Sequence, residues 1–214
     1  MIDDSPLSFV ESQKLLGIYI QNNLSWQNNI DNILLKINSL IALLRRIKRM
    51  MDFQTRIIFY KAYIQPHLDY CCIIWGNAKV EQLNVLLKLQ KRVLRIIFDY
   101  PDISSQTLFS QASIMPITKR IYFQKAVLMY KALHNLTPSY ISEEFQLCSD
   151  IHSYSSKSST HNVFIHRPRT ELLKSSFKYS GAVIWNSLSQ DMKSAQTLKQ
   201  FKNLLLHNLD LFQV

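Results

Sequence analysis

The fold of this chain is decided by residues 52–97, which read DFQTRIIFYKAYIQPHLDYCCIIWGNAKVEQLNVLLKLQKRVLRII. This stretch predicts two amphipathic helices joined by an apolar hinge at residues 70–76. At about 100° per residue, four basic side chains of the second helix fall on one stripe: Lys88, Lys91, Arg92 and Arg95. Apolar side chains fall on the opposite side: Leu83, Leu86, Leu87, Leu89, Val93, Leu94 and Ile97. We therefore expect a helix that is buried on one face and offers a cationic strip on the other.

Positive charge is concentrated around this stretch. Residues 36–95 contain twelve Lys or Arg against three Asp or Glu, so net +9 of the chain's +10 lies there. Such a balance favours an acidic partner, nucleic acid first and an anionic membrane surface second. A second basic group, Arg45, Arg46 and Arg49, ends the preceding helical pattern, where cations also complement the helix dipole. On charge alone, a solvated Lys/Arg face explains both groups equally well.

Composition points to a mainly helical fold in a reducing compartment. The hydrophobic share of 47% is enough for a core, and three Gly with six Pro favour helix over sheet. Three Cys cannot form a disulfide framework, which fits an intracellular location, nuclear or cytoplasmic. The polar, acidic start predicts no signal peptide, and no run reaches the ~18 apolar residues of a membrane span. We therefore expect no membrane partner.

The N-terminal half predicts a short hairpin followed by helices. Residues 7–10 and 15–20 have the pattern of short strands, with Gly17 as a bulge or a point of close backbone approach. Ser25 is expected to cap a helix of about five turns, and Asp52 is expected to cap the next helix. Pro66 should interrupt or restart that helix. Within the helix at residues 80–98, Gln90 is expected to be a buried, hydrogen-bonded amide.

Helical patterns continue through the C-terminal half. They occupy residues 104–111, a longer segment from Pro116 to about residue 134, a brief one at 137–147, and an amphipathic one at 197–211. A Ser-rich linker separates the helix at 197–211 from the earlier helices. Residues 162–166 have the pattern of a strand. The predicted class is mainly α, with a short N-terminal β-hairpin and a small C-terminal α+β segment.

Several short motifs occur in a fixed order along nearly the whole chain. They are KLLGI (14–18) with LSW (24–26), PHLDY (66–70) with WG (75–76), LQKRVLRII (89–97), RT (169–170), WNSL (185–188) and FK (201–202). Each motif alone is weak, but their order and spacing make the match specific. In this combination the chain resembles the C-terminal third of reverse transcriptases from non-LTR, jockey-like retrotransposons.

The resemblance implies a helical, thumb-like bundle that holds template RNA and primer. It also implies a division of the chain. Residues 1–21 would be a palm-edge hairpin remnant, 22–98 the thumb-like domain, 99–148 a helical continuation, 149–162 the Ser-rich linker, and 163–214 a C-terminal segment that ends in an amphipathic helix.

Polymerase chemistry requires carboxylates that hold two metal ions. In the family these lie upstream of the Leu-Gly-Ile strand, on an earlier strand and on a Tyr/Phe-x-Asp-Asp turn. Asp3 and Asp4 do not replace them, because only ten residues separate Asp4 from Leu15 and this sequence has no earlier metal-binding carboxylate. We also expect no endonuclease domain, and Cys148 alone cannot build a zinc site. We expect no catalytic residue, metal, cofactor or small-molecule substrate.

Two other patterns resemble enzyme sites. His67 and Asp69 have the His-x-Asp form of an iron(II) oxygenase triad, but the chain around the distant histidines reads as helix or linker. The same segment resembles a short N-terminal module of some tRNA-modifying, alkylation-repair-like proteins, yet the sequence does not support oxygenase or methyltransferase chemistry. Cys71 and Cys72 lie in an apolar run, where buried thiols are poor nucleophiles.

Some side chains outside the basic groups could also contact nucleic acid. Four aromatic residues could stack on bases: Trp26, Trp75, Tyr179 and Trp185. Core packing is the expected role of Trp26 and Trp75. Beyond the linker, Arg167, Arg169 and Lys178 could contact phosphate, although a solvated turn explains them equally well.

The sequence thus predicts a non-catalytic fragment that binds RNA or an RNA–DNA hybrid. The residues expected to bind are Arg45, Arg46, Arg49, Lys88, Lys91, Arg92 and Arg95. The competing hypothesis is a helical protein-interaction domain, or an inert product of a decayed element, that self-associates through apolar faces that a palm would cover. A peripheral membrane protein would require affinity for anionic lipid.

Overall fold

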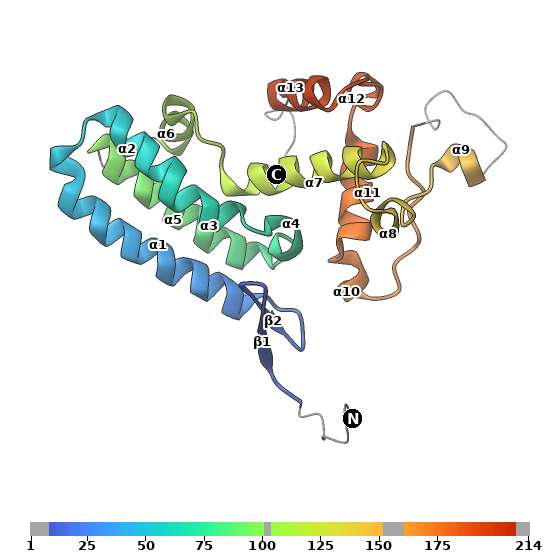
Figure 1. Ribbon diagram of the computed structural model, residues 1–214, viewed down its shortest axis with the longest axis horizontal. Helices are drawn as coiled ribbons and strands as arrows, with labels where there is room; N and C mark the ends of the chain where they lie inside the picture. Colours follow the sequence, from blue (N-terminus) through green and yellow to red (C-terminus); the bar gives the residue numbers. More distant parts are fainter. Residues whose placement is uncertain (1–8, 101–103, 152–160, 209–214) are drawn as a thin grey trace. The chain divides into compact units, whose positions relative to one another are not determined.

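The computed structural model describes residues 9–100, 104–151 and 161–208. It confirms the mainly α class, with a two-stranded antiparallel hairpin near the N-terminus (Figure 1). The chain forms two compact units. Unit 1 comprises Met1–Cys71 and Ala78–Ile114, and unit 2 comprises Cys72–Asn77 and Met115–Val214.

The hairpin of unit 1 turns at Leu16 and Gly17. Strand β1 (Ser12–Leu15) pairs with β2 (Ile18–Gln21), and Leu15 lies opposite Ile18. Both turn residues have positive φ, 46° and 86°, as a tight two-residue hairpin requires. The predicted strand at 7–10 is therefore wrong where it can be examined, since residues 9 and 10 lie outside both strands. The strand predicted at 15–20 is confirmed at Leu15 and at residues 18–20, but residues 16 and 17 form the turn between two strands, so Gly17 is a turn residue and not a bulge. Residues 1–8 lie outside the described part of the chain.

Helix α1 (Gln27–Ile47) receives its N-terminal cap from the hairpin. The predicted cap, Ser25, is wrong, because Trp26 precedes the helix in the left-handed conformation and makes no side-chain cap. Instead, Oε1 of Gln21 accepts hydrogen bonds from the Asn28 amide (3.0 Å) and from the Ser25 hydroxyl (2.9 Å). A strand residue therefore satisfies a free N–H of the first helical turn and fixes the hairpin to α1.

Helices α1 and α5 (Val80–Phe98) lie side by side and run parallel (Figure 1). Gln82 donates to Gln27 at their N-terminal ends (2.6 Å), and Lys48 pairs with Asp99 at their C-terminal ends. Both helices bury one apolar face, and α5 has the bounds that the sequence predicts. The buried residues on α5 include Leu86, Leu89, Val93, Leu94 and Ile97.

Residues 53–69, between these helices, form a single helical path with one widened turn. It consists of α2 (Phe53–Phe59), a π-helical turn (Tyr60–Ile64) and α3 (Gln65–Asp69). The predicted cap is confirmed, because Oδ1 of Asp52 accepts from the Thr55 amide at 2.8 Å. The path changes geometry just before Pro66, which cannot donate a helical hydrogen bond.

Gln90 is a buried amide, as predicted. It is 3% exposed, and its Nε2 donates to the Tyr60 hydroxyl at 2.7 Å, which joins α5 to the π-helical turn. Helix α6 (Ser105–Ala112) follows and packs against α5. Its N-terminus is capped by the Ser104 hydroxyl, which accepts from the Thr107 amide at 3.2 Å.

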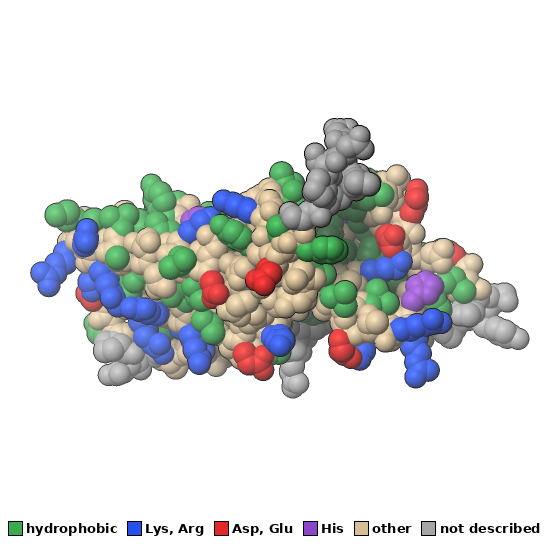
Figure 2. Space-filling model, turned by 90° about the horizontal axis from the view of Figure 1, so that it is seen from below, with side chains coloured by type: hydrophobic (Ala, Val, Ile, Leu, Met, Phe, Trp, Pro, Cys, Tyr) green, Lys and Arg blue, Asp and Glu red, His purple; other side chains and the backbone are tan. Residues whose placement is uncertain are grey.

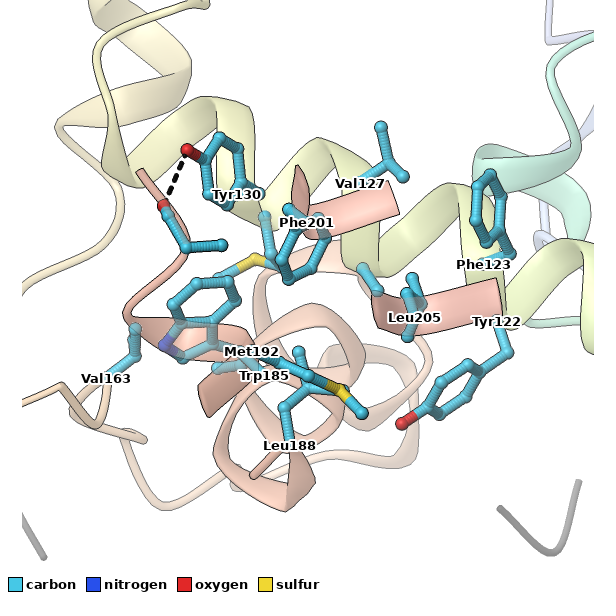
Figure 3. Close-up of a cluster of buried hydrophobic side chains, with 14 residues drawn as sticks. Tyr122, Phe123, Val127, Tyr130, Val163, Trp185, Leu188, Met192, Phe201 and Leu205 are labelled. Atoms are coloured by element: carbon cyan, nitrogen blue, oxygen red, sulfur yellow. Dashed lines mark hydrogen bonds between the residues drawn. The ribbon is translucent and has the colours of Figure 1, made fainter. Parts of the chain in front are cut away.

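Unit 2 is built around α7 (Ile117–Leu133), against which α11 (Phe177–Ser187) and α13 (Leu198–Asn208) pack. Helix α4 (Cys72–Trp75) also packs on α7. Figure 3 shows Tyr130, Trp185 and Phe201 gathered in the core, where the Tyr130 and Phe201 rings stack with centroids 4.6 Å apart. The Tyr130 hydroxyl donates to the Ala195 carbonyl at 2.9 Å.

Short helices connect these long ones: α8 (Ser139–Ser142), α9 (Cys148–Ile151), α10 (Glu171–Lys174) and α12 (Gln190–Lys193). The brief helix predicted at 137–147 therefore ends earlier than expected. Helix α9 covers the start of the expected linker, and residues 152–160 lie outside the described ranges.

The segment predicted as a strand at residues 162–166 forms one isolated bridge, between Leu147 and Val163. Side chains of unit 2 hold it in place. The Asn186 amide accepts from the Val163 N–H and donates to the Val163 carbonyl, both at 2.8 Å. Nε1 of Trp185 donates to the His161 carbonyl at 2.8 Å. The WNSL motif thus has a structural role, which is to anchor an extended segment.

Lys125 is a buried amino group that ties segment 72–77 to α7. Its side chain is 5% exposed, and Nζ donates to Oδ1 of Asn77 at 2.5 Å and to the Gly76 carbonyl at 3.4 Å. Burial lowers the pKa of Lys125 from 10.5 to about 8, because removal from water disfavours the charged form.

This shift predicts a pH-dependent stability. The penalty for burying the Lys125 charge is fully present below about pH 8 and fades toward pH 10.5, as the unfolded chain also loses the proton. The free energy of unfolding of wild type minus that of Lys125→Met should rise by about 2–3 kcal/mol from pH 7.5 to 10. Urea unfolding followed by tryptophan fluorescence measures it, and parallel pH profiles for the two proteins would contradict the prediction.

Candidate nucleic-acid interface

The basic stripe of α5, which comprises Lys88, Lys91, Arg92 and Arg95, faces solvent. Lys91 is half-buried and the other three side chains are exposed. The stripe lies opposite the apolar residues that pack into unit 1. The helical spacing therefore predicted the accessible side of α5 correctly, and its four cations are available to a ligand.

The second basic group, Arg45, Arg46 and Arg49, ends α1 and enters the short 3₁₀ turn Lys48–Met50. All three side chains are exposed. Because α1 and α5 run parallel with their C-terminal ends joined by Lys48 and Asp99, this group and the C-terminal part of the stripe lie at the same end of unit 1. Lys and Arg side chains crowd the left-hand part of the face shown in Figure 2. We call the seven residues the basic surface.

Two carboxylates, Asp52 and Asp99, lie at this end of unit 1. The Thr55 hydrogen bonds lower the pKa of Asp52, and the Lys48 ammonium lowers the pKa of Asp99. The Arg49 charge, which belongs to the basic surface, contributes a smaller part of the lowering at Asp99. Within the described ranges, none of the seven cations makes an ion pair. Their charge remains free to attract an anion.

Arg56 fixes the C-terminal ends of the two helices relative to each other. Its Nη1 donates to the Ile97 carbonyl at 3.0 Å, and its Nε donates to the carbonyls of Lys48 and Met51, both at 3.1 Å. These carbonyls lie at helix ends, where backbone acceptors often lack helical partners, although the Lys48 carbonyl also accepts from the Met51 amide at 3.3 Å. Arg56 thus positions the basic surface without belonging to it. The sequence offered no signal for this role, because its bonds join residues far apart in the chain.

Removal of this tie should destabilise unit 1. We expect Arg56→Gln to lower the free energy of unfolding by about 2–3 kcal/mol, because a charged donor to three carbonyls is lost. Arg95→Gln removes the same charge from an exposed position of α5 and should change stability by less than about 0.5 kcal/mol. Urea unfolding of both variants tests the difference, and equal effects would show that Arg56 has no positioning role.

The aromatic candidates are mostly part of the core. Trp26 is 9% exposed and Trp75 is 0% exposed, so their predicted packing role is confirmed. Trp185 is 2% exposed, so the interpretation of this residue as a base-stacking platform is wrong. Its indole is enclosed between α7 and α13. The burial of this side chain depends on tertiary packing, which the local sequence does not reveal. Tyr179 is half-buried.

The basic residues after the expected linker differ in whether they form an ion pair. Arg167 and Arg169 are exposed. Lys178 forms an ion pair with Glu144, so part of its charge is compensated within unit 2.

Among the described residues, His67 and Asp69 gain no third metal ligand. His67 is half-buried on α3, and burial, followed by the Lys36 charge, lowers its pKa. In the part of the chain that the structure describes, no three His, Cys, Asp or Glu side chains come together as a metal site. Asp3 and Asp4 lie outside that part. None of the described helices is both long and apolar enough to span a membrane.

No protein-family model matches this chain, and neither the curated proteins nor the solved structures contain a match.

Proposed function

We propose that this chain is a non-catalytic, thumb-like part of a non-LTR retrotransposon reverse transcriptase, and that it binds RNA or an RNA–DNA hybrid through the basic surface. In this proposal the protein holds a polyanion by neutralising its phosphates and does not alter it. It uses no metal, cofactor or small-molecule substrate. The family assignment rests on the ordered motifs, from KLLGI at residues 14–18 to FK at 201–202.

One observation carries the binding proposal. Two parallel helices bring Arg45, Arg46 and Arg49 to the same end of unit 1 as the C-terminal part of the stripe, and none of these cations makes an ion pair within the described residues. A lone stripe is typical of many solvated helices, whereas two basic groups at one end of a unit can contact phosphates of the same strand. Phosphate contacts of this kind bind largely without regard to base sequence.

Filter binding to single-stranded RNA and to an RNA–DNA hybrid tests the proposal. We expect both to bind at about 0.15 M salt and to bind more weakly as salt rises, because bound phosphates release counterions. Lack of measurable affinity at that salt would contradict the proposal. Metal-dependent incorporation of nucleotides by the purified chain would contradict its non-catalytic part.

Exposed apolar residues favour a second candidate, a helical protein-interaction domain. On unit 1, Leu35 is 70% exposed, Ile58 is 62% exposed and Tyr63 is 57% exposed. Such side chains would be covered if the chain associated with itself or with another protein. Size-exclusion chromatography over a concentration series distinguishes the candidates: self-association without RNA affinity favours this one, and a monomer that binds RNA favours the first.

A further inference from the structure

Unit 2 contains a cavity of about 310 Å³ that belongs to none of the sites above. Three segments form it: the turn after α8, with Glu144 and Phe145; the extended residues 164–166; and helices α10 and α11, with Leu173 and Lys178. The volume lies at the lower end of the range for small-molecule pockets. It suits a ligand with one ring system.

Aromatic and aliphatic side chains make the walls of the cavity. The Phe145 ring packs edge-on against Phe177, with centroids 5.8 Å apart, and the Phe164 ring packs edge-on against His166, at 4.9 Å. Leu173 adds an aliphatic wall from α10. Rings held in this way offer an apolar surface to a flat aromatic group.

Polar groups complete the lining. Lys178 and Glu144 are ion-paired and half-exposed, and His166 adds a ring nitrogen. A carboxylate accepts hydrogen bonds from amino groups, and an ammonium donates to carbonyl groups. An unpaired base presents both kinds of group on its edges, so this combination suits a base better than a plain hydrocarbon.

Hydrogen bonds hold the extended wall of the pocket in place. The Phe164 amide donates to the Gln146 carbonyl at 2.8 Å, and Asn186 holds the preceding residue, Val163, by two hydrogen bonds. The extended wall is therefore fixed at its start by backbone and side-chain contacts. A preformed wall reduces the entropy lost on binding.

Two arginines follow the extended wall of the pocket along the chain. Arg167 follows His166 directly in the chain, Arg169 lies two residues later, and both are exposed. A ring bound in the pocket would therefore have guanidinium groups nearby for an attached phosphate.

We propose that this pocket holds one unpaired base of a bound RNA strand, with the adjoining phosphate contacting Arg167 and Arg169. The inference rests on the proposed function and adds to it a contact that does not depend on the basic surface. Stacking on aromatic side chains tolerates any base, so binding should depend on the presence of a base more than on its identity.

Mononucleotides test the pocket apart from the basic surface. Titration calorimetry of the full chain should show binding of AMP and UMP, with ribose 5-phosphate at least tenfold weaker because it lacks the base. Leu173→Glu places a carboxylate in the pocket and should weaken AMP binding by tenfold or more. The matched control, Leu172→Glu, changes the neighbouring residue, which is 55% exposed and outside the lining, and should have less than a twofold effect.

The outcomes separate this inference from the proposed function. Replacement of the basic stripe by alanine should leave AMP binding within twofold while it weakens RNA binding. RNA binding without any mononucleotide binding would overturn the pocket and leave the proposed function standing. Equal binding of ribose 5-phosphate, or equal effects of Leu173→Glu and Leu172→Glu, would also overturn it. Binding of N-acetylphenylalaninamide in place of AMP would assign the pocket to a protein ligand and overturn the inference.

Discussion

Replacement of Trp185 by alanine is expected to lower the free energy of unfolding of unit 2 by about 3–5 kcal/mol. The indole is 2% exposed, and its ring centroid lies 5.9 Å from that of Phe201 in the core of unit 2 (Figure 3). The change leaves a cavity among α7, α11 and α13. It also removes the 2.8 Å hydrogen bond from Nε1 to the His161 carbonyl, so the extended segment loses one of its anchors.

Val183→Ala on the same helix provides the matched control. Val183 is 42% exposed, so its truncation should cost less than about 1 kcal/mol. Urea unfolding followed by circular dichroism measures both variants without use of the tryptophan signal. A loss below about 1 kcal/mol for Trp185→Ala would mean that Trp185 does not organise this core.

The second large effect concerns binding. Replacement of Lys88, Lys91, Arg92 and Arg95 by alanine should weaken binding to single-stranded RNA by about 10²-fold at 0.15 M salt, if each cation neutralises one phosphate. All four changes lie on the solvent side of α5, so the buried face should remain intact. Circular dichroism and thermal unfolding of the variant check that its helices persist.

A control variant separates position from net charge. Lys14, Lys36, Lys61 and Lys79 are exposed lysines of unit 1 outside the basic surface. Their replacement by alanine removes the same charge and should weaken RNA binding by less than about tenfold. Equal losses in the two variants would attribute binding to the overall charge of the chain and not to the stripe.

The long helices could be predicted because their signals are local. In α5, apolar spacing alone gave the bounds 80–98, the solvent side with Lys88 and Arg92, and the burial of Gln90. Asp52 caps the residue three positions later, within one turn. Each of these features depends on residues within the same helix or its cap.

The wrong predictions share a different cause, which is contact between distant residues. Gln21, not Ser25, caps α1, since the hairpin folds back onto the helix. The hairpin turn lies at Leu16 and Gly17, where the Tyr70 hydroxyl donates to the Leu16 carbonyl at 2.6 Å from 54 positions away. Trp185 is enclosed by helices on either side of it in the chain. Periodicity carries no information about such partners.

The candidate site was predictable in part for the same reasons. Helical spacing identified the stripe and the Arg45, Arg46 and Arg49 group separately. Their arrival at one end of unit 1 depends on the parallel pairing of α1 and α5 and on the Arg56 tie, which link residues more than 40 positions apart. The cavity in unit 2 depends likewise on three segments that only the fold brings together.

The salt dependence of RNA affinity tests the central claim most directly, because its slope counts the phosphates that the protein neutralises. The slope of log K against log salt should be smaller in magnitude by about 3 for the variant that lacks Lys88, Lys91, Arg92 and Arg95 than for wild type. The lysine control should retain most of the wild-type slope. An unchanged slope in the stripe variant would show that the nucleic acid, if bound at all, lies elsewhere on the protein.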